Sequence, residues 1–245
     1  TQGIQMEIDG DWVKAKGTTL GADNGLGVAA IMSILESNDI PHPALEALFT
    51  IDEETGMTGA MGLKPGQLNG EILLNLDTEE DDEIDIGCAG GIDVTATQNY
   101  GLENARGQIV KIEVKGLQGG HSGMDIIKGF GNSNVILGRL LYTGLYNQNI
   151  QLISIDGGGL RNAIPREANM VLSVRHSVEF MEQVAALKKE ILEEFASVEK
   201  DLHINIETFS SAEKAISEED SKKIILALKS AHNGVYRMSP DVEDL

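Results

Sequence analysis

The chain has 245 residues, of which 41% are hydrophobic, so it is long enough for one large domain or two modest domains with a real core. It carries 39 Asp and Glu against 19 Lys and Arg, and a formal net charge of -20 argues against nucleic acid or an anionic membrane surface as a partner, because both need basic patches. The single cysteine, Cys88, excludes an intrachain disulfide and favours a reducing, cytoplasmic compartment. No segment approaches the roughly 18 apolar residues that a membrane span needs.

The part of the chain before residue 90 alternates helical patterns with short apolar runs. Residues 24–37 predict a mostly buried helix, and residues 57–63 predict a short one. Residues 45–51 and 72–76 are compact apolar runs that are typical of strands. This alternation predicts a mostly parallel α/β sheet with covered faces, in which ligands bind beyond the carboxyl ends of the strands.

After Gly90-Gly91 the pattern changes to that of a separate α+β layer. Its expected strands are residues 92–97, 110–114, 150–155, 168–174 and 202–209. Its expected helices are residues 131–145, 178–198 and 217–232. Residues 178–198 form the clearest amphipathic helix, and Ser217 is a good N-cap for the last one.

Acidic residues follow short apolar runs at three positions in the first third of the chain: Asp23, the pair Glu53-Glu54, and Asp77. Carboxylates at neighbouring strand ends can converge on one point, where they repel each other unless cations hold them. Neighbouring side chains point in different directions, so Glu54 can bind a metal while Glu53 acts as a general base. This pattern predicts a metal-dependent hydrolase. The alternative is ordinary loop acids and helix N-caps.

The remaining candidate residues lie in two glycine-rich loops. Carboxylates alone would suit Mg²⁺ or Ca²⁺, whereas zinc normally takes at least one imidazole. His121 lies between glycines that let the backbone approach a ligand, although a plain loop residue is the alternative. In residues 157–165, Arg161 offers a guanidinium for a carboxylate and Asn162 an amide for a carbonyl; a tight crossover between strands is the alternative.

Several motifs together resemble the co-catalytic zinc exopeptidases, in particular the bacterial Xaa-His dipeptidases, which are similar to carnosinases. The motifs are Gly-Thr-Thr-Leu-Gly-Ala-Asp-Asn-Gly (17–25), Asp-Glu-Glu-Thr-Gly (52–56), Asn-Leu-Asp-Thr-Glu-Glu (75–80), Gly-Gly-His-Ser-Gly (119–123) and Arg-Asn-Ala-Ile-Pro-Arg-Glu-Ala (161–168). The run Ile-Gly-Cys-Ala-Gly-Gly-Ile-Asp (86–93) resembles the dipeptidase branch. The resemblance covers essentially the whole chain.

The resemblance implies a set of roles and a division of the chain. Asp23 would bridge two zinc ions, with a cis peptide bond to Asn24; cobalt or manganese could replace zinc. Glu54 and Asp77 would each bind one of the two ions, and Glu53 would be the general base. His121 would stabilise the oxyanion, and Asn162 and Arg161 would contact substrate. Residues 1–89 would belong to the catalytic domain, and residues 90–245 to a lid domain that mediates homodimerisation.

The implied activity is hydrolysis of dipeptides such as β-alanyl-histidine. The family's His-x-Asp motif does not precede Asp23, and its final histidine ligand does not appear in the chain. We therefore expect a fragment that alone binds metal weakly and shows little activity. The alternatives are an N-acyl amino acid amidohydrolase of the same family and a non-catalytic binding or assembly module with an incomplete metal site.

Overall fold

The computed structural model describes residues 3–78, 82–87, 90–147, 149–210, 214–238 and 240. Cys88 and the last two residues of the segment 75–80 lie outside the described residues. The chain divides into two compact units, residues 1–93 and residues 94–245. None of the helices in the described parts combines the length and the apolar character that a membrane span requires.

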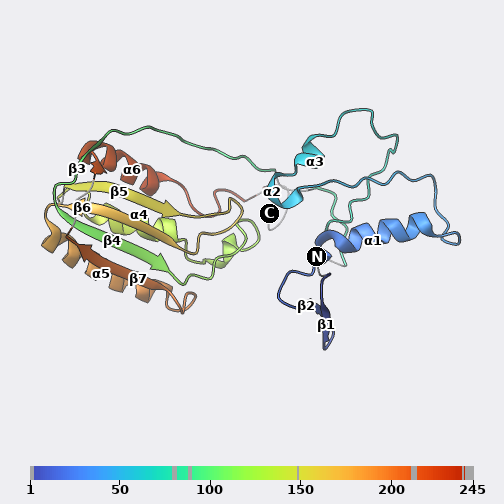
Figure 1. The fold of residues 1–245 in the computed structure, drawn as a ribbon, viewed down its shortest axis with the longest axis horizontal. Coiled ribbons are helices and arrows are strands. Elements are labelled where there is room, and N and C mark those ends of the chain that lie inside the picture. Colours follow the sequence, from blue (N-terminus) through green and yellow to red (C-terminus); the bar gives the residue numbers. More distant parts are fainter. Residues whose placement is uncertain are drawn as a thin grey trace. The chain divides into compact units, whose positions relative to one another are not determined.

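In the N-terminal unit, the described residues form an antiparallel hairpin followed by three helices (Figure 1). The elements are strands β1 (Met6–Asp9) and β2 (Trp12–Ala15) and helices α1 (Ala22–Glu36), α2 (Glu53–Gly56) and α3 (Thr58–Met61). Helix α1 confirms the helix predicted for residues 24–37, but Gly27 is its only buried residue, so the expectation of a mostly buried helix is wrong for this structure. Helix α3 lies within the predicted residues 57–63. The hairpin and α2 are not among the predicted elements.

The predicted parallel sheet is not seen in the described residues. Residues 45–51 and 72–76 carry no strand and pair with no other segment that the structure describes. Ile72, Leu73 and Leu74 are 83%, 78% and 79% exposed. A parallel strand needs neighbouring strands and helices over both faces, and no described strand lies beside these runs. The strand prediction is therefore wrong for this structure, although the apolar character on which it rested is present.

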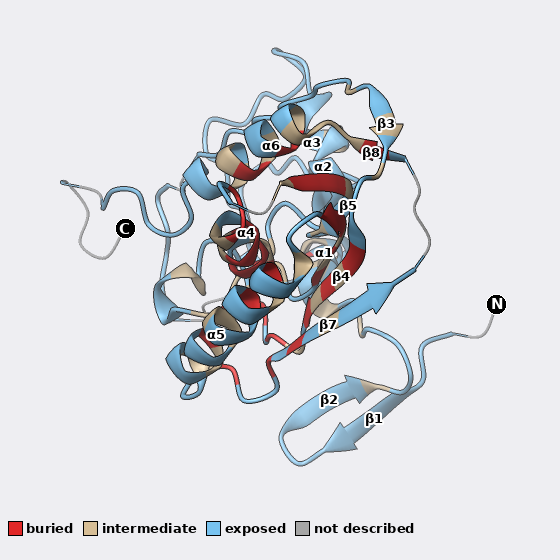
Figure 2. Ribbon diagram, turned by 90° about the vertical axis from the view of Figure 1, so that its left-hand side faces the viewer, coloured by how far each residue is buried: buried red, intermediate tan, exposed pale blue. Residues whose placement is uncertain are grey.

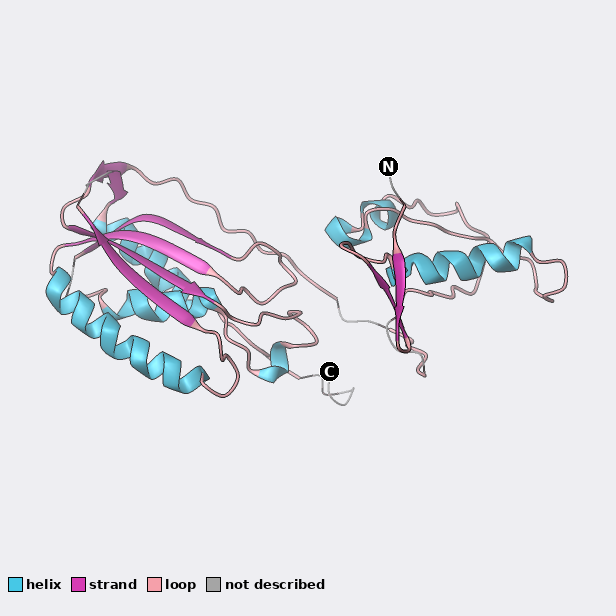
Figure 3. Cartoon of the chain, turned by 60° about the horizontal axis from the view of Figure 1, so that its bottom comes forward, coloured by secondary structure: helices cyan, strands magenta, loops and turns pink. Residues whose placement is uncertain are grey.

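The C-terminal unit is built on a four-stranded antiparallel sheet in the order β5-β6-β4-β7 (Figures 1 and 3). Its strands are β4 (Gln108–Lys115), β5 (Ile150–Gly157), β6 (Ala168–Val174) and β7 (His203–Phe209). Its helices are α4 (Ser133–Thr143), α5 (Ser177–Phe195) and α6 (Glu218–Ser230), with a short 3-10 helix, η1 (Ile126–Lys128). A small separate pair joins β3 (Leu102–Asn104) to β8 (Lys214–Ile216).

The chain order β4-α4-β5-β6-α5-β7 with this strand order is the split β-α-β arrangement of ferredoxin-like layers. Most of the predicted elements of this unit are present, so the expected α+β layer is confirmed. The strand predicted for residues 92–97 is wrong, because these residues are not in a strand and belong to none of the described sheets.

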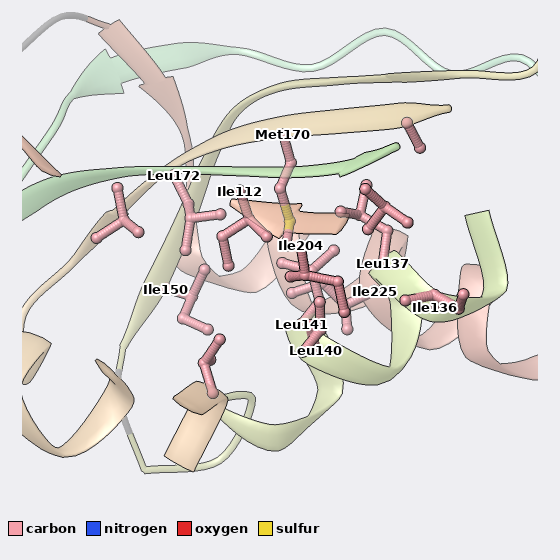
Figure 4. Close-up of a cluster of buried hydrophobic side chains, with 14 of the residues drawn as sticks. Ile112, Ile136, Leu137, Leu140, Leu141, Ile150, Met170, Leu172, Ile204 and Ile225 are labelled. Carbon is pink, nitrogen blue, oxygen red and sulfur yellow. The ribbon is translucent and has the colours of Figure 1, made fainter. Parts of the chain in front are cut away.

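One face of the sheet packs against the helices to form the core of this unit. Along β4, Val110, Ile112 and Val114 are fully buried, whereas Lys111 and Glu113 between them form an ion pair with a Nζ–Oε1 distance of 2.7 Å. This alternation follows from the period of two in a strand. Figure 2 shows buried segments in the strands and in α4 and α5. Figure 4 shows the side chains that meet there: Ile112, Ile136, Leu137, Leu140, Leu141, Ile150, Met170, Leu172, Ile204 and Ile225.

Helix α5 has the buried face, and helix α6 the N-cap, that their sequences predict. In α5, Phe180, Val184 and Ile191 are fully buried at helical spacing. Helix α6 begins after Ser217, whose Oγ accepts a hydrogen bond from the amide of Asp220 at 3.1 Å. The capping interaction predicted for Ser217 is therefore confirmed.

Candidate functional site

The acidic pair Glu53-Glu54 opens helix α2, and a hydrogen-bonded turn fixes the start of that helix. Asp52 has a φ of 64°, in the left-handed region. Its carboxylate accepts hydrogen bonds from the hydroxyls of Thr55 and Thr58, the latter at 2.7 Å. Asp52 therefore shapes the turn that presents the two glutamates. The sequence analysis assigns it no role, although the threonines three and six residues later are a usable signal.

Asp23 lies at the irregular start of helix α1. The peptide bond between Asp23 and Asn24 is cis, as the resemblance implies, and both residues have non-helical backbone angles. The Oδ1 of Asn24 accepts a hydrogen bond from the amide of Gly27 at 2.9 Å, and the regular helix follows. The N-cap position belongs to Gly21 and carries no side-chain cap, so the interpretation of Asp23 as a simple N-cap is not supported.

The structure brings the four carboxylates close enough for their charges to interact. Loss of hydration raises the pKa of Glu53, and repulsion by Glu54, Asp77 and Asp23 adds to it. Loss of hydration also raises the pKa of Asp77, followed by the charge of Asp23 and a hydrogen bond between the two carboxyl groups. Three segments far apart in the sequence therefore bring these carboxylates near one another, without the parallel sheet that was expected to gather them.

These carboxylates fit a metal ion only in part. In the described ranges of the chain, no group of three or more His, Cys, Asp and Glu side chains is arranged to hold an ion. Repulsion between charges acts over several ångströms, whereas ligation requires oxygens within roughly 2.0–2.2 Å of one zinc ion. Asp23, Glu54 and Asp77 thus have carboxylate oxygens that can bind a cation, and they lie near one another. Their side chains are not arranged around a common ion position.

In the C-terminal unit, His121 is an exposed residue of the loop that follows β4, and hydrogen bonds orient its ring. The ring Nδ1 lies 3.1 Å from the amide of Gly123 and 3.3 Å from the amide of Met124, and both amides donate to it. A nitrogen that accepts these bonds carries no proton, so the neutral ring carries its proton on Nε2. The ring is therefore prepared to donate a hydrogen bond through Nε2.

Asp125 holds the backbone of the same loop. One of its carboxylate oxygens accepts from the amide of His121 at 2.7 Å, and the other pairs with Nζ of Lys128 at 2.6 Å. The hydrogen bond from Lys128, followed by that from the amide of His121, lowers the pKa of Asp125. The sequence analysis does not single out Asp125; an Asp four residues after a glycine-flanked His is the signal that could have found it.

The two predicted glycine-rich loops lie side by side. His121 and Ala163 form an antiparallel bridge, and the amide of Ser122 donates to the carbonyl oxygen of Asn162 at 2.9 Å. The amide of Ile164 donates to the carbonyl oxygen of Gly120 at 2.8 Å. His121, Arg161 and Asn162 are therefore neighbours in space, although about 40 residues separate them in the sequence.

An open recess of about 360 Å³ lies beside these loops. Its wall includes Arg161 and Ser122, together with Asn132 and Asn134 at the start of α4 and Pro165. The side chains of His121 and Asn162 do not belong to this wall. Of the two residues that the resemblance assigns to substrate, the structure thus places Arg161 at the recess and Asn162 in the loop contact.

The C-terminal unit defines the class of protein first. Residues 112–203, which contain the second half of β4, the strands β5 and β6 and the helices α4 and α5, match the family model described as the peptidase dimerisation domain. That domain belongs to the M20 peptidase family.

Individual relatives extend the match beyond this domain. The chain is 42% identical over 240 residues to the cytosol non-specific dipeptidase of Escherichia coli. The aligned region covers 96% of this chain and 50% of the relative. The crystal structure of the aminoacylhistidine dipeptidase from Vibrio alginolyticus superimposes with a TM-score of 0.69 at 41% identity, over 98% of this chain and 50% of that one. The resemblance predicted from the motifs is confirmed: over nearly its whole length, the chain is a relative of these M20 dipeptidases, and it spans half of their length.

Proposed function

We propose that the complete protein to which this chain corresponds is a cytoplasmic metallo-dipeptidase that hydrolyses dipeptides, with Xaa-His substrates such as β-alanyl-histidine. The observation that carries the proposal is the convergence of Asp23, Glu53, Glu54 and Asp77 from three separate segments. The match to relatives named as a cytosol non-specific dipeptidase and an aminoacylhistidine dipeptidase supports the substrate class.

The residues have distinct roles in this proposal. Asp23, Glu54 and Asp77 would hold two divalent ions, with zinc as the metal that the resemblance implies. When bound, such ions lower the pKa of water and polarise the scissile carbonyl group. Glu53 takes the proton of the attacking water and passes it to the leaving amine.

The C-terminal unit contributes donors rather than metal ligands. His121 donates a hydrogen bond from its Nε2–H group to the oxyanion of the tetrahedral intermediate. The hydrogen bonds that its Nδ1 accepts leave Nε2 free for this role. Arg161 and Asn162 contact the substrate, the first through its guanidinium and the second through its amide. The match of residues 112–203 to a dimerisation domain supports a homodimer formed through residues 90–245.

Hydrolysis of β-alanyl-histidine and a panel of other dipeptides by the complete gene product tests the activity. We expect cleavage with added Zn²⁺ and its loss with a chelator. Metal binding with cleavage of N-acyl amino acids alone would replace the proposal by a deacylase. Failure to bind metal or cleave any substrate would leave a binding module.

The variant Glu53→Gln tests the mechanism in the same protein. Removing a general base typically lowers the rate by ~10²–10⁴-fold, so we expect turnover to collapse while the metal content stays at the wild-type level. Glu71→Gln is the matched control, because Glu71 is an exposed glutamate of the same unit outside the carboxylate cluster. Retained turnover in Glu53→Gln would refute the assignment of the base.

A further inference from the structure

A buried carboxylate lies beneath the loop that carries His121. Glu199, in the turn after α5, is only 3% exposed. Its Oε2 accepts a hydrogen bond from the amide of Gln118 at 2.8 Å, and its Oε1 accepts one from the amide of Gly131 at 2.7 Å. A buried carboxylate is costly unless it is hydrogen-bonded, and here each oxygen receives a backbone donor. One side chain therefore holds both ends of the segment 118–131.

Other contacts close the base of this loop around the same turn. The side-chain amide of Gln118 donates to the carbonyl oxygen of Val198. Gly131 lies so close to the carboxylate that a Cβ there would be 3.4 Å from both Cγ and Oε1 of Glu199 and 2.6 Å from Leu117. The base of the loop is thus built from the turn after α5, not from the loop itself.

The tip of the loop has little packing of its own. Residues 121–124 are all exposed, so hydrogen bonds and the ends of the loop decide where His121 lies. The amides of Gly123 and Met124 can reach Nδ1 only if the turn at residues 121–124 keeps its shape. That turn is held by Asp125, by the backbone hydrogen bonds of Gly120 and Ser122 to the neighbouring loop, and by the base of its own loop.

We propose that Glu199 is a positioning residue: by accepting the amides of Gln118 and Gly131, it holds the His121 loop in the shape that fixes the Nε2-protonated ring. This inference rests on the proposed role of His121 as an oxyanion donor. Glu199 touches neither substrate nor reacting atoms and acts through the loop alone.

The carboxylate is specifically required at this position. The variant Glu199→Gln is nearly isosteric, but an amide offers a single acceptor oxygen, and its NH₂ group would face a backbone N–H. One end of the loop would therefore lose its partner. A displacement of about 1 Å at a catalytic group can cost ~10²-fold in rate, so we expect Glu199→Gln to lower kcat by ~10–10²-fold. KM should change little, because an oxyanion donor acts in the transition state.

A double-mutant cycle in the complete gene product separates positioning from general damage. We expect His121→Ala to lower kcat, and Glu199→Gln to have no further effect in the His121→Ala background, because both act through one group. A loss caused by Glu199→Gln that is equally large in both backgrounds would overturn the inference. An unchanged kcat in His121→Ala would instead refute the oxyanion role in the proposed function.

The matched control is Ser221→Ala, which also removes a buried acceptor of a backbone amide. Ser221 is fully buried, and its Oγ accepts from the amide of Leu152 at 2.8 Å and donates to the carbonyl oxygen of Ile216, so neither partner belongs to the segment 118–131. This variant should lower stability without lowering kcat. If it lowers kcat as much as Glu199→Gln does, the effect is structural and the inference fails.

A spectroscopic measurement decides the inference even if the complete protein cleaves no dipeptide. The ¹⁵N shifts of an imidazole distinguish which ring nitrogen carries the proton. We expect His121 to show the Nε2-protonated tautomer at neutral pH in the wild type and in Ser221→Ala, and a mixture of tautomers in Glu199→Gln. An unchanged His121 signal in Glu199→Gln would overturn the inference.

Discussion

Gly116, at the junction between β4 and the His121 loop, provides a quantitative test of how the C-terminal unit is assembled. Its φ is 80°, and a Cβ at this position would lie 1.8 Å from the carbonyl oxygen of Asp201. Gly129 has a similar φ of 71°, but a Cβ there would meet no atom within 4 Å. Substitution by alanine therefore imposes the same backbone penalty at both positions and a steric clash at only one.

The two penalties can be compared from the contacts. A left-handed alanine costs roughly 1–2 kcal/mol, which is the whole cost expected for Gly129→Ala. At Gly116 the Cβ and the carbonyl oxygen must separate to about 3.3 Å or more, the shortest ordinary contact between carbon and oxygen. That movement pulls apart the Lys115–His203 end of the β4–β7 pairing and the hydrogen bond from Gln118 to Glu199. Two hydrogen bonds at roughly 1 kcal/mol each add about 2 kcal/mol to the cost of Gly116→Ala.

Amide hydrogen exchange of the buried β4 residues Val110 and Ile112 is the appropriate assay. A melting curve of the whole chain would mix the transitions of two compact units, so one midpoint would have no simple meaning. We expect the free energy of opening to fall by about 2 kcal/mol more in Gly116→Ala than in Gly129→Ala. Equal effects, within about 0.5 kcal/mol, would show that the approach of Asp201 does not hold this junction together.

Two further predictions concern the core and the capping of α6. Phe180 is fully buried against Gly144 and Ile150, so Phe180→Ala should lower the free energy of unfolding of the C-terminal unit by about 3–5 kcal/mol, measured by the same exchange experiment; a loss below 1 kcal/mol would contradict its place in the core. The hydrogen bond from Lys223, followed by that from Ser217, lowers the pKa of Asp220. Because the pKa is lower in the folded state, the stabilisation is present above the ordinary aspartate pKa of about 3.9 and is lost as the pH falls through the lowered value. Asp220→Asn should therefore reduce stability at neutral pH, and the difference from wild type should vanish in acid; a difference that persists in acid would contradict this linkage.

Much of the C-terminal unit could be predicted from local patterns. The apolar residues of α5 recur at helical spacing, and the residues of β4 alternate between core and surface, so one buried face specifies each element. Ser217 marks the start of α6 because its hydroxyl satisfies a free amide there. The apolar runs at residues 45–51 and 72–76 show the limit of such patterns. An apolar run indicates that a segment is suited to burial. A strand, however, forms only beside another strand, and no described strand pairs with either run.

The sequence by itself determined which side chains could carry the chemistry: the acids at positions 23, 53, 54 and 77, and the histidine and arginine of two glycine-rich loops. Only the tertiary structure decided that the acids interact, that the two loops lie side by side, and that the Nδ1 of His121 accepts hydrogen bonds from backbone amides. In the sequence, Glu199 is one glutamate among many beyond an amphipathic helix. Its importance comes from the amides of Gln118 and Gly131, which lie 81 and 68 residues away in the sequence and donate to its carboxylate. No local sequence pattern predicts such contacts.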